Sequence, residues 1–548
     1  MLPQLYWCHE MVAKFLPDWR PSFVGIDEDQ FDAGQSRNIL ASSLGMKTLL
    51  ILLIALTPSF SSEFASGIVY HDSNNNQQRD RGERGIYNVG VSNGLEITET
   101  DFKGRWRLPA SDDAIFFVLK PAGWMTPLNE HQLPRFHYIH KPKGSPLSKF
   151  PGTSATGPLP ESIDFPLHKQ KEPNEFRVIF FGDPQPRNQV EIDYIANDVV
   201  AELVGTDAKF GVTLGDILFD DLSLFGSLNS TIALVGIPWF NVIGNHDLNT
   251  DAKEDRYSDE TFESVYGPPY YSFDYGKVHF IVLDNIDWSY NEKRNRGGYR
   301  GNFGKRQLDF VASDLERVPK GRLVVLLMHI PLTGTVDRQS LYRLIEKRPY
   351  TLSLSGHTHW QAHQFIDESD GWKGKEPHHH IVNVTVSGSW WKGAKDDRGI
   401  PHTTMRDGAP NGYSFLTFDG NKATFEFKAA RFPDSHQLRI HAPVFIEGSA
   451  SEKTYVYANV FAGSSKSTVR LRVDKGDWIE MEKTLEADPF YVELRKVEKD
   501  AINAPIKSDH LWKSLLPPNL TRGVHSLEVI TRDMYGREFT ATRVLRVE

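Results

Sequence analysis

The sequence predicts a central α/β domain flanked by two small all-β sandwich domains. From about residue 64, and again from about residue 435, short runs of alternating apolar and polar residues are separated by turns. Between these regions, apolar β-rich runs alternate with longer segments of helical spacing, at 190–204 and 305–317. A length of 548 residues suits three or four domains of roughly 150 residues each.

The predicted domain boundaries follow changes in composition along the chain. An N-terminal β domain is expected over residues 64–140, because short strands such as 100–108 and 114–119 follow one another there. A stretch rich in Pro, Gly and Ser predicts a linker over 141–171. The α/β domain is expected over 172–430, and a second β-sandwich over 431–548.

A short apolar run near the N-terminus predicts export. Met46 and Lys47 precede apolar residues 49–56, a run shorter than the ~20 residues that span a bilayer. A basic start, a short apolar run and a small-residue exit describe a secretory signal peptide over 46–61. Residues 1–45 would then be an upstream extension, and the mature protein would be secreted or periplasmic, with no membrane span. A buried apolar helix or an N-terminal anchor is the alternative.

Composition excludes several classes of protein. The net charge of −9 argues against a nucleic-acid partner held by bulk electrostatics. Cys8 is the only cysteine, so a disulfide framework is impossible. With 39% hydrophobic and 24% charged residues, the chain can bury several cores and is not expected to be disordered.

Five apolar runs of the central domain each end in side chains that can bind a metal. These endings are Gly182-Asp183-Pro184-Gln185, Gly215-Asp216, Gly244-Asn245-His246-Asp247, His329, and Gly356-His357-Thr358-His359. Functional residues of open α/β sheets gather at the carboxyl edge of the strands. A mixture of carboxylates, amide oxygens and imidazoles suits Mn, Fe, Zn or Mg. The sequence therefore predicts a divalent metal centre at this edge.

The order and spacing of these motifs resemble the calcineurin-like metallophosphoesterase superfamily over residues 172–365. The flanking β domains are similar to those of a bacterial subgroup with N- and C-terminal β-sandwiches. The resemblance implies a four-layer α/β/β/α sandwich for the central domain. It also implies a hydrolase that uses two metal ions on a phosphomonoester or phosphodiester, with a metal-bridging hydroxide attacking phosphorus in line.

The resemblance further implies two adjoining ion sites that share one carboxylate. The first would be formed by Asp183, Gln185, Asp216 and His359, and the second by Asp216, Asn245, His329 and His357. His246 would contact the phosphate and assist the leaving group, and Asp247 would orient His246. Gln185 departs from the family pattern, which usually has His there. An amide oxygen makes the first site harder and weaker, so the metal identity and occupancy remain open.

Three side chains outside these motifs are candidates for substrate contact. Trp390 and Trp391 could line a pocket or pack between domains, and both interpretations remain open. Arg300 could reach a substrate phosphate, although an ordinary surface arginine is the preferred interpretation. The run His378-His379-His380 is interpreted as a solvated loop, since alternate residues of a strand cannot share one ion.

A polar loop near the start of the N-terminal β domain has the spacing of a calcium loop. Oxygen ligands occupy positions 1, 3, 5, 9 and 12, namely Asp72, Asn74, Asn76, Asp80 and Glu83. The loop is similar to those of calcium-binding repeats in bacterial surface adhesins. Gln77 stands where such loops usually have Gly, so a structural calcium ion and a simple polar turn both remain open.

Two functions follow from these observations. The first is an exported phosphohydrolase, and the alternative is a cell-surface glycan- or polymer-binding protein whose central domain is vestigial. The complete set of predicted ligands, together with His246, favours the enzyme. The sequence sets neither the substrate nor the oligomeric state.

Overall fold

The computed structural model describes residues 63–499 and 501–548, which belong to one compact unit. The upstream extension and signal peptide predicted for residues 1–61 lie outside this described part. Within it, no helix combines the length and the apolar character needed to cross a bilayer.

The N-terminal β domain contains two four-stranded sheets, with strand orders β4-β1-β8-β6 and β3-β2-β5-β7. The strands are β1 (Phe64–His71), β2 (Gly90–Ser92), β3 (Ile97–Glu99), β4 (Arg105–Pro109), β5 (Ala114–Val118), β6 (Trp124–Met125), β7 (His137–His140) and β8 (Phe165–Lys169). Strand β8 lies in the predicted linker, so the linker prediction needs correction. Phe165 and Leu167 are both buried, because alternate residues of a strand face the same side. Strand β8 pairs in parallel with β1.

The central domain contains a five-stranded sheet of order β11-β10-β9-β20-β21 and a six-stranded sheet of order β12-β13-β16-β17-β19-β18. The first comprises β9 (Glu175–Phe181), β10 (Phe210–Leu214), β11 (Trp239–Val242), β20 (Gly412–Asp419) and β21 (Lys422–Ala429). The second comprises β12 (Tyr271–Tyr275), β13 (Val278–Val282), β16 (Leu323–Leu327), β17 (Thr351–Ser355), β18 (Ala362–Ile366) and β19 (His378–Val382).

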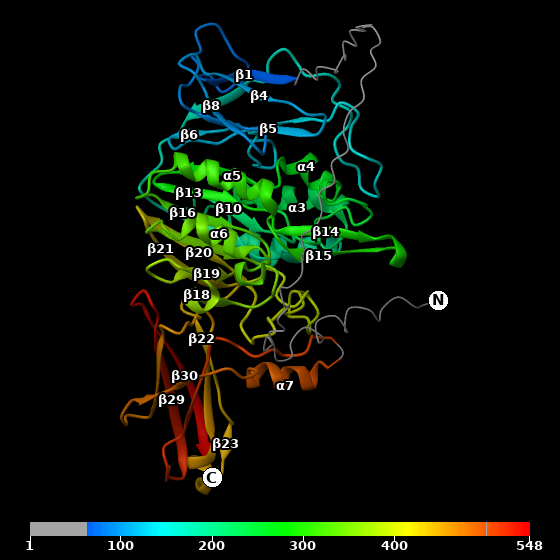
Figure 1. Ribbon diagram of the computed structural model, residues 1–548. Coiled ribbons are helices and arrows are strands. Elements are labelled where there is room, and N and C mark those ends of the chain that lie inside the picture. The colour runs from blue at the N-terminus through cyan, green and yellow to red at the C-terminus, as the bar shows by residue number, and fades with distance from the viewer. Residues whose placement is uncertain (1–62, 500) are drawn as a thin grey trace, which may run out of the picture. The chain divides into compact units, whose positions relative to one another are not determined.

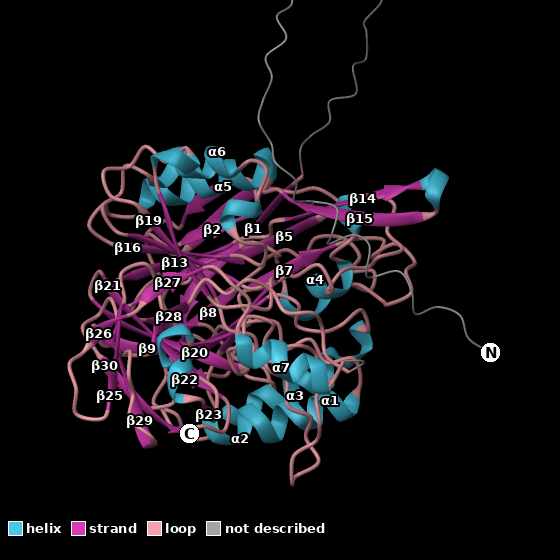
Figure 2. Ribbon diagram, turned by 90° about the horizontal axis from the view of Figure 1, so that it is seen from below, coloured by secondary structure: helices cyan, strands magenta, loops and turns pink. Residues whose placement is uncertain are grey.

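Helices cover the outer face of each sheet, which confirms the predicted four-layer α/β/β/α fold. The helices are α1 (Gln189–Ile195), a π-turn (Ala196–Val200), α2 (Ala201–Leu203), α3 (Phe225–Ile232), α4 (Glu260–Tyr266), α5 (Gly304–Arg317) and α6 (Arg338–Ile345). Figure 2 shows α1 and α3 on one side of the sheets and α5 and α6 on the other. The helical spacing at 190–204 corresponds to α1, the π-turn and α2, and that at 305–317 corresponds to α5.

The two central sheets face each other across an aromatic core. The ring of Phe240 on β11 stacks on that of Phe273 on β12, with 4.0 Å between centroids. Phe210 on β10 packs edge-on against Phe280 on β13, at 5.3 Å. Because both faces of β10, β13 and β16 are covered, these strands are apolar at nearly every position. This packing fixes the two sets of strand ends relative to each other.

The C-terminal β domain is a second sandwich with its own core. Its sheets have the orders β22-β24-β28-β27 and β23-β30-β29-β25-β26. The elements are β22 (Leu438–His441), β23 (Phe445–Ile446), β24 (Tyr455–Val460), β25 (Thr468–Val473), β26 (Ile479–Glu480), β27 (Glu482–Thr484), α7 (Pro489–Val497), β28 (Leu511–Leu515), β29 (Gly523–Arg532) and β30 (Glu538–Val547). His510 Nε2 lies 2.9 Å from Asp407 Oδ2, which also accepts the Gln361 N–H. The sandwich is thereby joined to the chain just beyond His359.

A two-stranded hairpin extends from the central domain (Figure 1). It is formed by β14 (Ile286–Asn291) and β15 (Arg296–Gly301), which pair antiparallel. Trp288 and Tyr299 are opposite each other and share one face of the hairpin, whereas Asp287 and Arg300 share the other.

The three consecutive histidines do not form a solvated loop, so that prediction is wrong. They begin β19, which lies between β17 and β18. His378 and His380 are buried, and each has a ring nitrogen within 2.8 Å of the Ser353 hydroxyl. Hydroxyls of the neighbouring strand satisfy these imidazoles, and a sequence does not reveal which strand is the neighbour.

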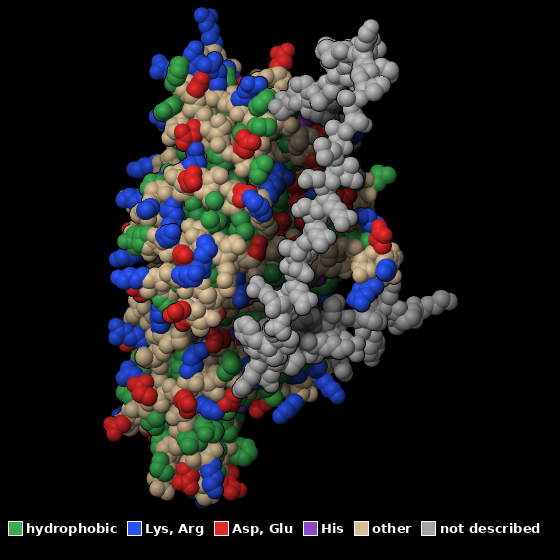
Figure 3. Space-filling view, viewed as in Figure 1, with side chains coloured by type: hydrophobic (Ala, Val, Ile, Leu, Met, Phe, Trp, Pro, Cys, Tyr) green, Lys and Arg blue, Asp and Glu red, His purple; other side chains and the backbone are tan. Residues whose placement is uncertain are grey.

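Charged side chains of both signs are interspersed on the face seen in Figure 3. Lys and Arg side chains are frequent along the left edge of this view, and Asp and Glu side chains lie among them over the rest of the visible face.

Candidate metal centre

Five strand ends meet at one edge of the paired sheets. Strands β9, β10 and β11 are mutually parallel, as are β16 and β17, so their carboxyl ends point the same way. The residues that follow these strands are Asp183, Asp216, Asn245, His329 and His357, in that order. The structure therefore gathers the predicted ligands at the edge where sequence reasoning expected them.

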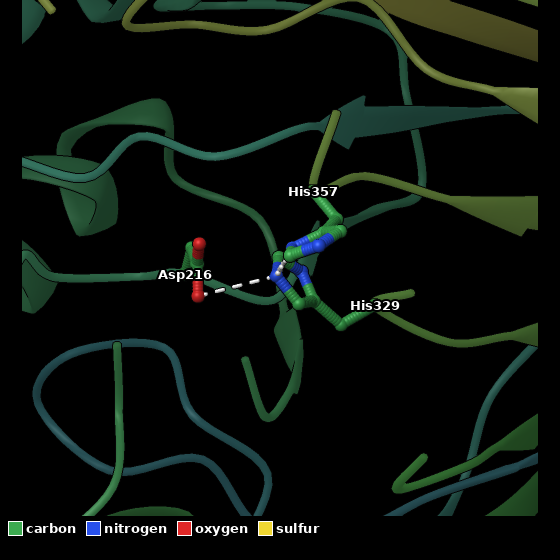
Figure 4. A group of neighbouring side chains, drawn as sticks. All are labelled: Asp216, His329 and His357. Carbon is green, nitrogen blue, oxygen red and sulfur yellow. Dashed lines mark hydrogen bonds and ion pairs between the residues drawn. The ribbon is translucent and has the colours of Figure 1, made fainter. Parts of the chain in front are cut away.

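The ligands predicted for the second ion form the tightest group. The side chains of Asp216, His329 and His357 point toward one another in Figure 4. Among the described residues, they alone form a group of three His, Cys, Asp or Glu side chains with ligand atoms within 4.8 Å of one another. His329 Nε2 lies 3.2 Å from Asp216 Oδ1, 3.2 Å from His357 Nδ1 and 3.1 Å from Asn245 Oδ1. Four donor atoms thus surround one small volume.

This group of donors fits a divalent cation. His329 Nδ1 donates to the Leu214 carbonyl at 2.8 Å, which leaves Nε2 facing the other three donors. Burial opposes a charge on His329, but Asp216 and Asp183 outweigh it and raise its pKa to about 9. Burial lowers the pKa of His357 to about 3, so its lone pairs are available. The raised pKa of His329 shows that the site attracts positive charge, and a cation bound there would take the place of its Nε2 proton. The mixture of carboxylate, amide oxygen and imidazole ligands suits Mn, Fe, Zn or Mg.

The residues predicted for the first ion lie beside this group. His359 Nε2 is 3.7 Å from Asp183 Oδ1, and His359 Nδ1 donates to the Gly388 carbonyl at 2.6 Å. Burial lowers the pKa of His359 to about 4 and raises that of Asp183 to about 8. The Gln185 carboxamide donates from Nε2 to Asp216 Oδ2 at 2.8 Å and accepts at Oε1 from Trp390 Nε1 at 2.6 Å. The Asp183 and Asp216 carboxylates and His359 Nε2 therefore lie together, whereas the Gln185 amide is bonded at its oxygen to Trp390 and at its nitrogen to Asp216.

The backbone at these positions adopts a conformation that non-glycine residues seldom use. Left-handed φ angles of 41° to 74° occur at Asp183, Gln185, Asp216, His357 and His359. Such strain costs roughly 1–3 kcal/mol per residue and concentrates at functional sites. The left-handed conformation turns each side chain away from the direction of its strand and toward the other ligands.

Two motif glycines are required by close packing. A Cβ at Gly244 would lie 1.9 Å from the Asp216 backbone nitrogen. A Cβ at Gly356 would lie 2.5 Å from Asp183 Oδ2. The absence of side chains at these positions lets the ligand-bearing loops touch one another.

His246 lies at the edge of the centre and is oriented by Asp220. Its Nδ1 is 2.7 Å from Asp220 Oδ1, its backbone N–H donates to Asp216 Oδ1 at 2.9 Å, and its ring stacks on Phe219. Burial opposes a charge on the imidazole, but Asp216 and Asp220 raise its pKa to about 9. The prediction that Asp247 orients His246 is corrected by this contact.

Asp247 instead ties the loops together. Its buried carboxylate accepts N–H groups from Ile217, Leu218 and Gly244 at 2.9 to 3.1 Å. Three backbone donors on two loops make it a structural anchor for the segment that carries Asp216.

The candidate substrate-contact residues have different surroundings. Trp390 lies over His359, with 4.2 Å between ring centroids. Trp391 is only 4% exposed and packs in the helical layer against Tyr194, so it cannot line a pocket. Arg300 pairs with Asp287 on the hairpin face opposite Tyr299. Tyr299, rather than Arg300, contacts the centre: its ring packs edge-to-face with that of His357, with 6.1 Å between the ring centroids.

Three family models match this chain. In chain order, they are N terminal of Calcineurin-like phosphoesterase over residues 73–153, Calcineurin-like phosphoesterase over 176–361, and C terminal of Calcineurin-like phosphoesterase over 380–539. The chain belongs to the calcineurin-like phosphoesterases. The resemblance stated from the motifs is therefore confirmed, including both flanking domains of this family.

Solved structures give one further comparison. The chain is similar to a purple acid phosphatase from seeds of yellow lupin (Lupinus luteus), with 14% sequence identity and a TM-score of 0.33. The alignment covers 67% of this chain and 66% of that one, so the chain spans just under two thirds of the lupin protein's length. No curated protein matches the chain.

The predicted calcium loop is closed by its own hydrogen bonds. Asp72 accepts the backbone N–H groups of Asn76 and Gln77, and Asp80 accepts the side-chain amides of Asn74 and Asn76. Glu83 accepts the N–H of Ser73 and the N–H of Asp80. A structural calcium ion at this loop stays a prediction.

Sequence reasoning missed three groups that contact the centre. Asp220 follows the Gly215-Asp216 motif by four residues, so its position in that loop was the available signal. Tyr299 lies next to Arg300 on β15 but on the other face of the hairpin, so the pleat of the strand was the available signal. The Gly388 carbonyl, which holds His359, has no side-chain signal at all.

Proposed function

We propose that this protein is a phosphoester hydrolase that requires two divalent metal ions at the ends of β9, β10, β11, β16 and β17. The observation that carries the proposal is the convergence of Asp216, Asn245, His329 and His357 on one buried volume. This member of the calcineurin-like phosphoesterases keeps the ligand-bearing motifs in order. An intact donor set argues against the alternative of a binding protein with a vestigial central domain.

The predicted ligands would form two adjoining ion sites. Asp216, Asn245, His329 and His357 would hold one ion, and Asp183, Asp216 and His359 would hold the other. When bound, ions at such positions supply positive charge for the phosphoryl oxygens and lower the pKa of a nearby water. Mn, Fe, Zn and Mg are all compatible with this mixture of donors.

The chain's own contribution to the reaction centres on His246. Asp220 occupies Nδ1, so Nε2 is the atom left to deliver a proton to the leaving oxygen. The side chain is about a quarter exposed, at 26%, so a substrate can reach it. Asp216 accepts the backbone N–H of the same residue, and this contact fixes His246 relative to the ligands.

The substrate is proposed to be a phosphomonoester or a phosphodiester. Partly exposed rings of Phe219, Tyr299 and Trp390 border His246, His357 and His359 respectively. These rings offer apolar surface for the group attached to the phosphate. Export remains part of the proposal and depends only on the apolar run at 49–56. No nucleic-acid partner is proposed.

The test is a panel of phosphatase, phosphodiesterase and nucleotidase substrates assayed with Mn, Zn, Fe and Mg added separately to metal-free protein. We expect hydrolysis in at least one metal condition and its loss in His246→Ala, with metal content unchanged. Purified protein that binds fewer than one transition metal per chain and hydrolyses nothing would overturn the proposal in favour of the binding protein.

A further inference from the structure

The orientation of the Gln185 carboxamide is set by chemistry. Trp390 Nε1 lies 2.6 Å from one end of the amide, and an indole nitrogen can only donate a hydrogen bond. The atom facing Trp390 must therefore be the amide oxygen, Oε1. It follows that the NH₂ group faces Asp216, where Nε2 is 2.8 Å from Oδ2.

Trp390 is itself held firmly in the position from which it donates. Its backbone carbonyl accepts a hydrogen bond from Arg187 at 2.9 Å, and its backbone N–H donates to the Ser387 carbonyl at 2.7 Å. Its ring lies over His359 on one side and within 5.3 Å of the Lys392 ammonium. The φ angle of 66° is a strained conformation that these contacts maintain.

The same loop also holds a ligand of the first ion. The carbonyl of Gly388, two residues before Trp390, accepts the Nδ1 proton of His359. This loop, residues 388–391, therefore fixes the tautomer of His359 and the rotamer of Gln185 together. We call it the tryptophan loop.

We propose that Gln185 is a hydrogen-bond donor to Asp216 rather than a metal ligand, and that Trp390 is the positioning residue that enforces this role. The inference rests on the proposed metal centre. Asp216 is then held at both oxygens, by the His246 N–H at Oδ1 and by Gln185 at Oδ2. The first ion keeps three protein ligands and the second keeps four, so this chain binds one ion tightly and the other weakly.

Metal titration of metal-free protein tests the inference. Mn²⁺ binding is measured by calorimetry, and the ions that survive dialysis are counted by elemental analysis. We expect one retained ion per wild-type chain and a second, weaker binding event. Gln185→Ala should keep the retained ion and change the Kd of the weaker event by less than about threefold. Gln185→His supplies an imidazole ligand and should lower that Kd at least tenfold, in the range of about 10 to 100 for such contacts.

Two tryptophan variants separate positioning from loop disruption. Trp390→Phe keeps a ring over His359 but removes the indole N–H, which frees Oε1 to turn toward the ions, so the Kd of the weaker event should fall at least threefold. Trp391→Phe is the matched control: that indole is buried, its Nε1 has no hydrogen-bond partner, and its φ of 51° is also left-handed. Its titration should match that of the wild type.

The outcomes distinguish this inference from the proposed function. Two equally tight ions in the wild type, or loss of the weaker event in Gln185→Ala, would identify Gln185 as a ligand and overturn the inference alone. Identical titrations for Trp390→Phe and the wild type would remove Trp390 from its positioning role. Absence of metal binding in every variant would overturn the proposed function as well.

Discussion

Two sets of histidines occupy the same six-stranded sheet and its loops, and they have opposite roles. His329, His357 and His359 follow the ends of β16 and β17, whereas His279 and His380 lie inside β13 and β19. All five side chains are largely withdrawn from solvent, so burial does not separate the two sets.

The difference between the sets is what the second ring nitrogen faces. His279 is bonded at both nitrogens, to Asp274 and Asp314 at 2.8 Å each. His380 is likewise bonded at both, to Ser353 and Ser355. His329 and His359 instead bond through Nδ1 to a backbone carbonyl, so that Nε2 faces the carboxylates and the other predicted metal ligands. A histidine can act as a metal ligand when one ring nitrogen is bonded to the backbone and the other faces further ligands.

The largest expected effect comes from removing a strand-end histidine. His357→Ala should lower kcat/KM for an aryl phosphate at least about 100-fold, because it removes a ligand from the buried group. Its midpoint of thermal unfolding in metal-free buffer should stay close to that of the wild type. Steady-state kinetics and calorimetry measure both quantities, and a fully active variant would contradict the assignment.

Removing a strand-interior histidine should do the reverse. His380→Ala leaves the buried Ser355 hydroxyl without its partner, removes one of the two histidine contacts of Ser353 and opens a cavity, at a cost of about 3 to 4 kcal/mol. Denaturant unfolding measures the loss. Activity per mole of folded protein should fall less than threefold, and a loss comparable to that of His357→Ala would erase the distinction between the sets.

The pH dependence of stability sharpens the same comparison. Burial opposes a charge on His279, but Asp314 and Asp274 outweigh it and raise its pKa from 6.5 to about 9. Arg322, which pairs with Asp274, faces the same group. Because the folded pKa is raised, the stabilisation is complete below pH 6.5 and is lost as the pH rises through about 9.

This loss should be of order 3 kcal/mol in the free energy of unfolding. Urea unfolding at pH 6, 8 and 10 measures it, and His279→Gln is the control, since its stability should lack that decline. If the free energy of unfolding changed by the same amount between pH 6 and pH 10 in the wild type and in His279→Gln, His279 would not be charged in the folded protein.

The smallest expected effect is at the residue that orients His246. Asp220→Asn keeps a polar group beside Nδ1 but removes the charge, and kcat should fall about tenfold while KM changes little. Asp247→Asn should differ, because its carboxylate holds three backbone N–H groups and its loss should lower stability first. If the two variants lost the same activity and the same stability, the assignment of Asp220 to orienting His246 and of Asp247 to holding the loops would be wrong.

The metal ligands were predictable because each stands directly after an apolar strand. A short run such as 323–328, which contains β-branched residues, favours a buried strand, and His329 then lies at its end. Asp220 and Tyr299 were not predictable in the same way, since each comes from a loop or hairpin whose path depends on packing. The strand at 165–169 falls inside the predicted linker because the Pro and Ser residues nearby outweigh its two apolar residues, Phe165 and Leu167.

The sequence by itself determined the order of the domains, the four-layer class of the central one and the edge at which the ligands gather. Periodicity and strand-end position carry that information, because both are local. Only the tertiary structure decided which nitrogen of each histidine is free, which carboxylate holds His246 and which way the Gln185 amide faces. Those properties depend on partners between 26 and 205 residues away in the chain, such as Asp220 for His246 and Trp390 for Gln185. Hydrogen bonds between distant segments exist only once the strands have been brought together.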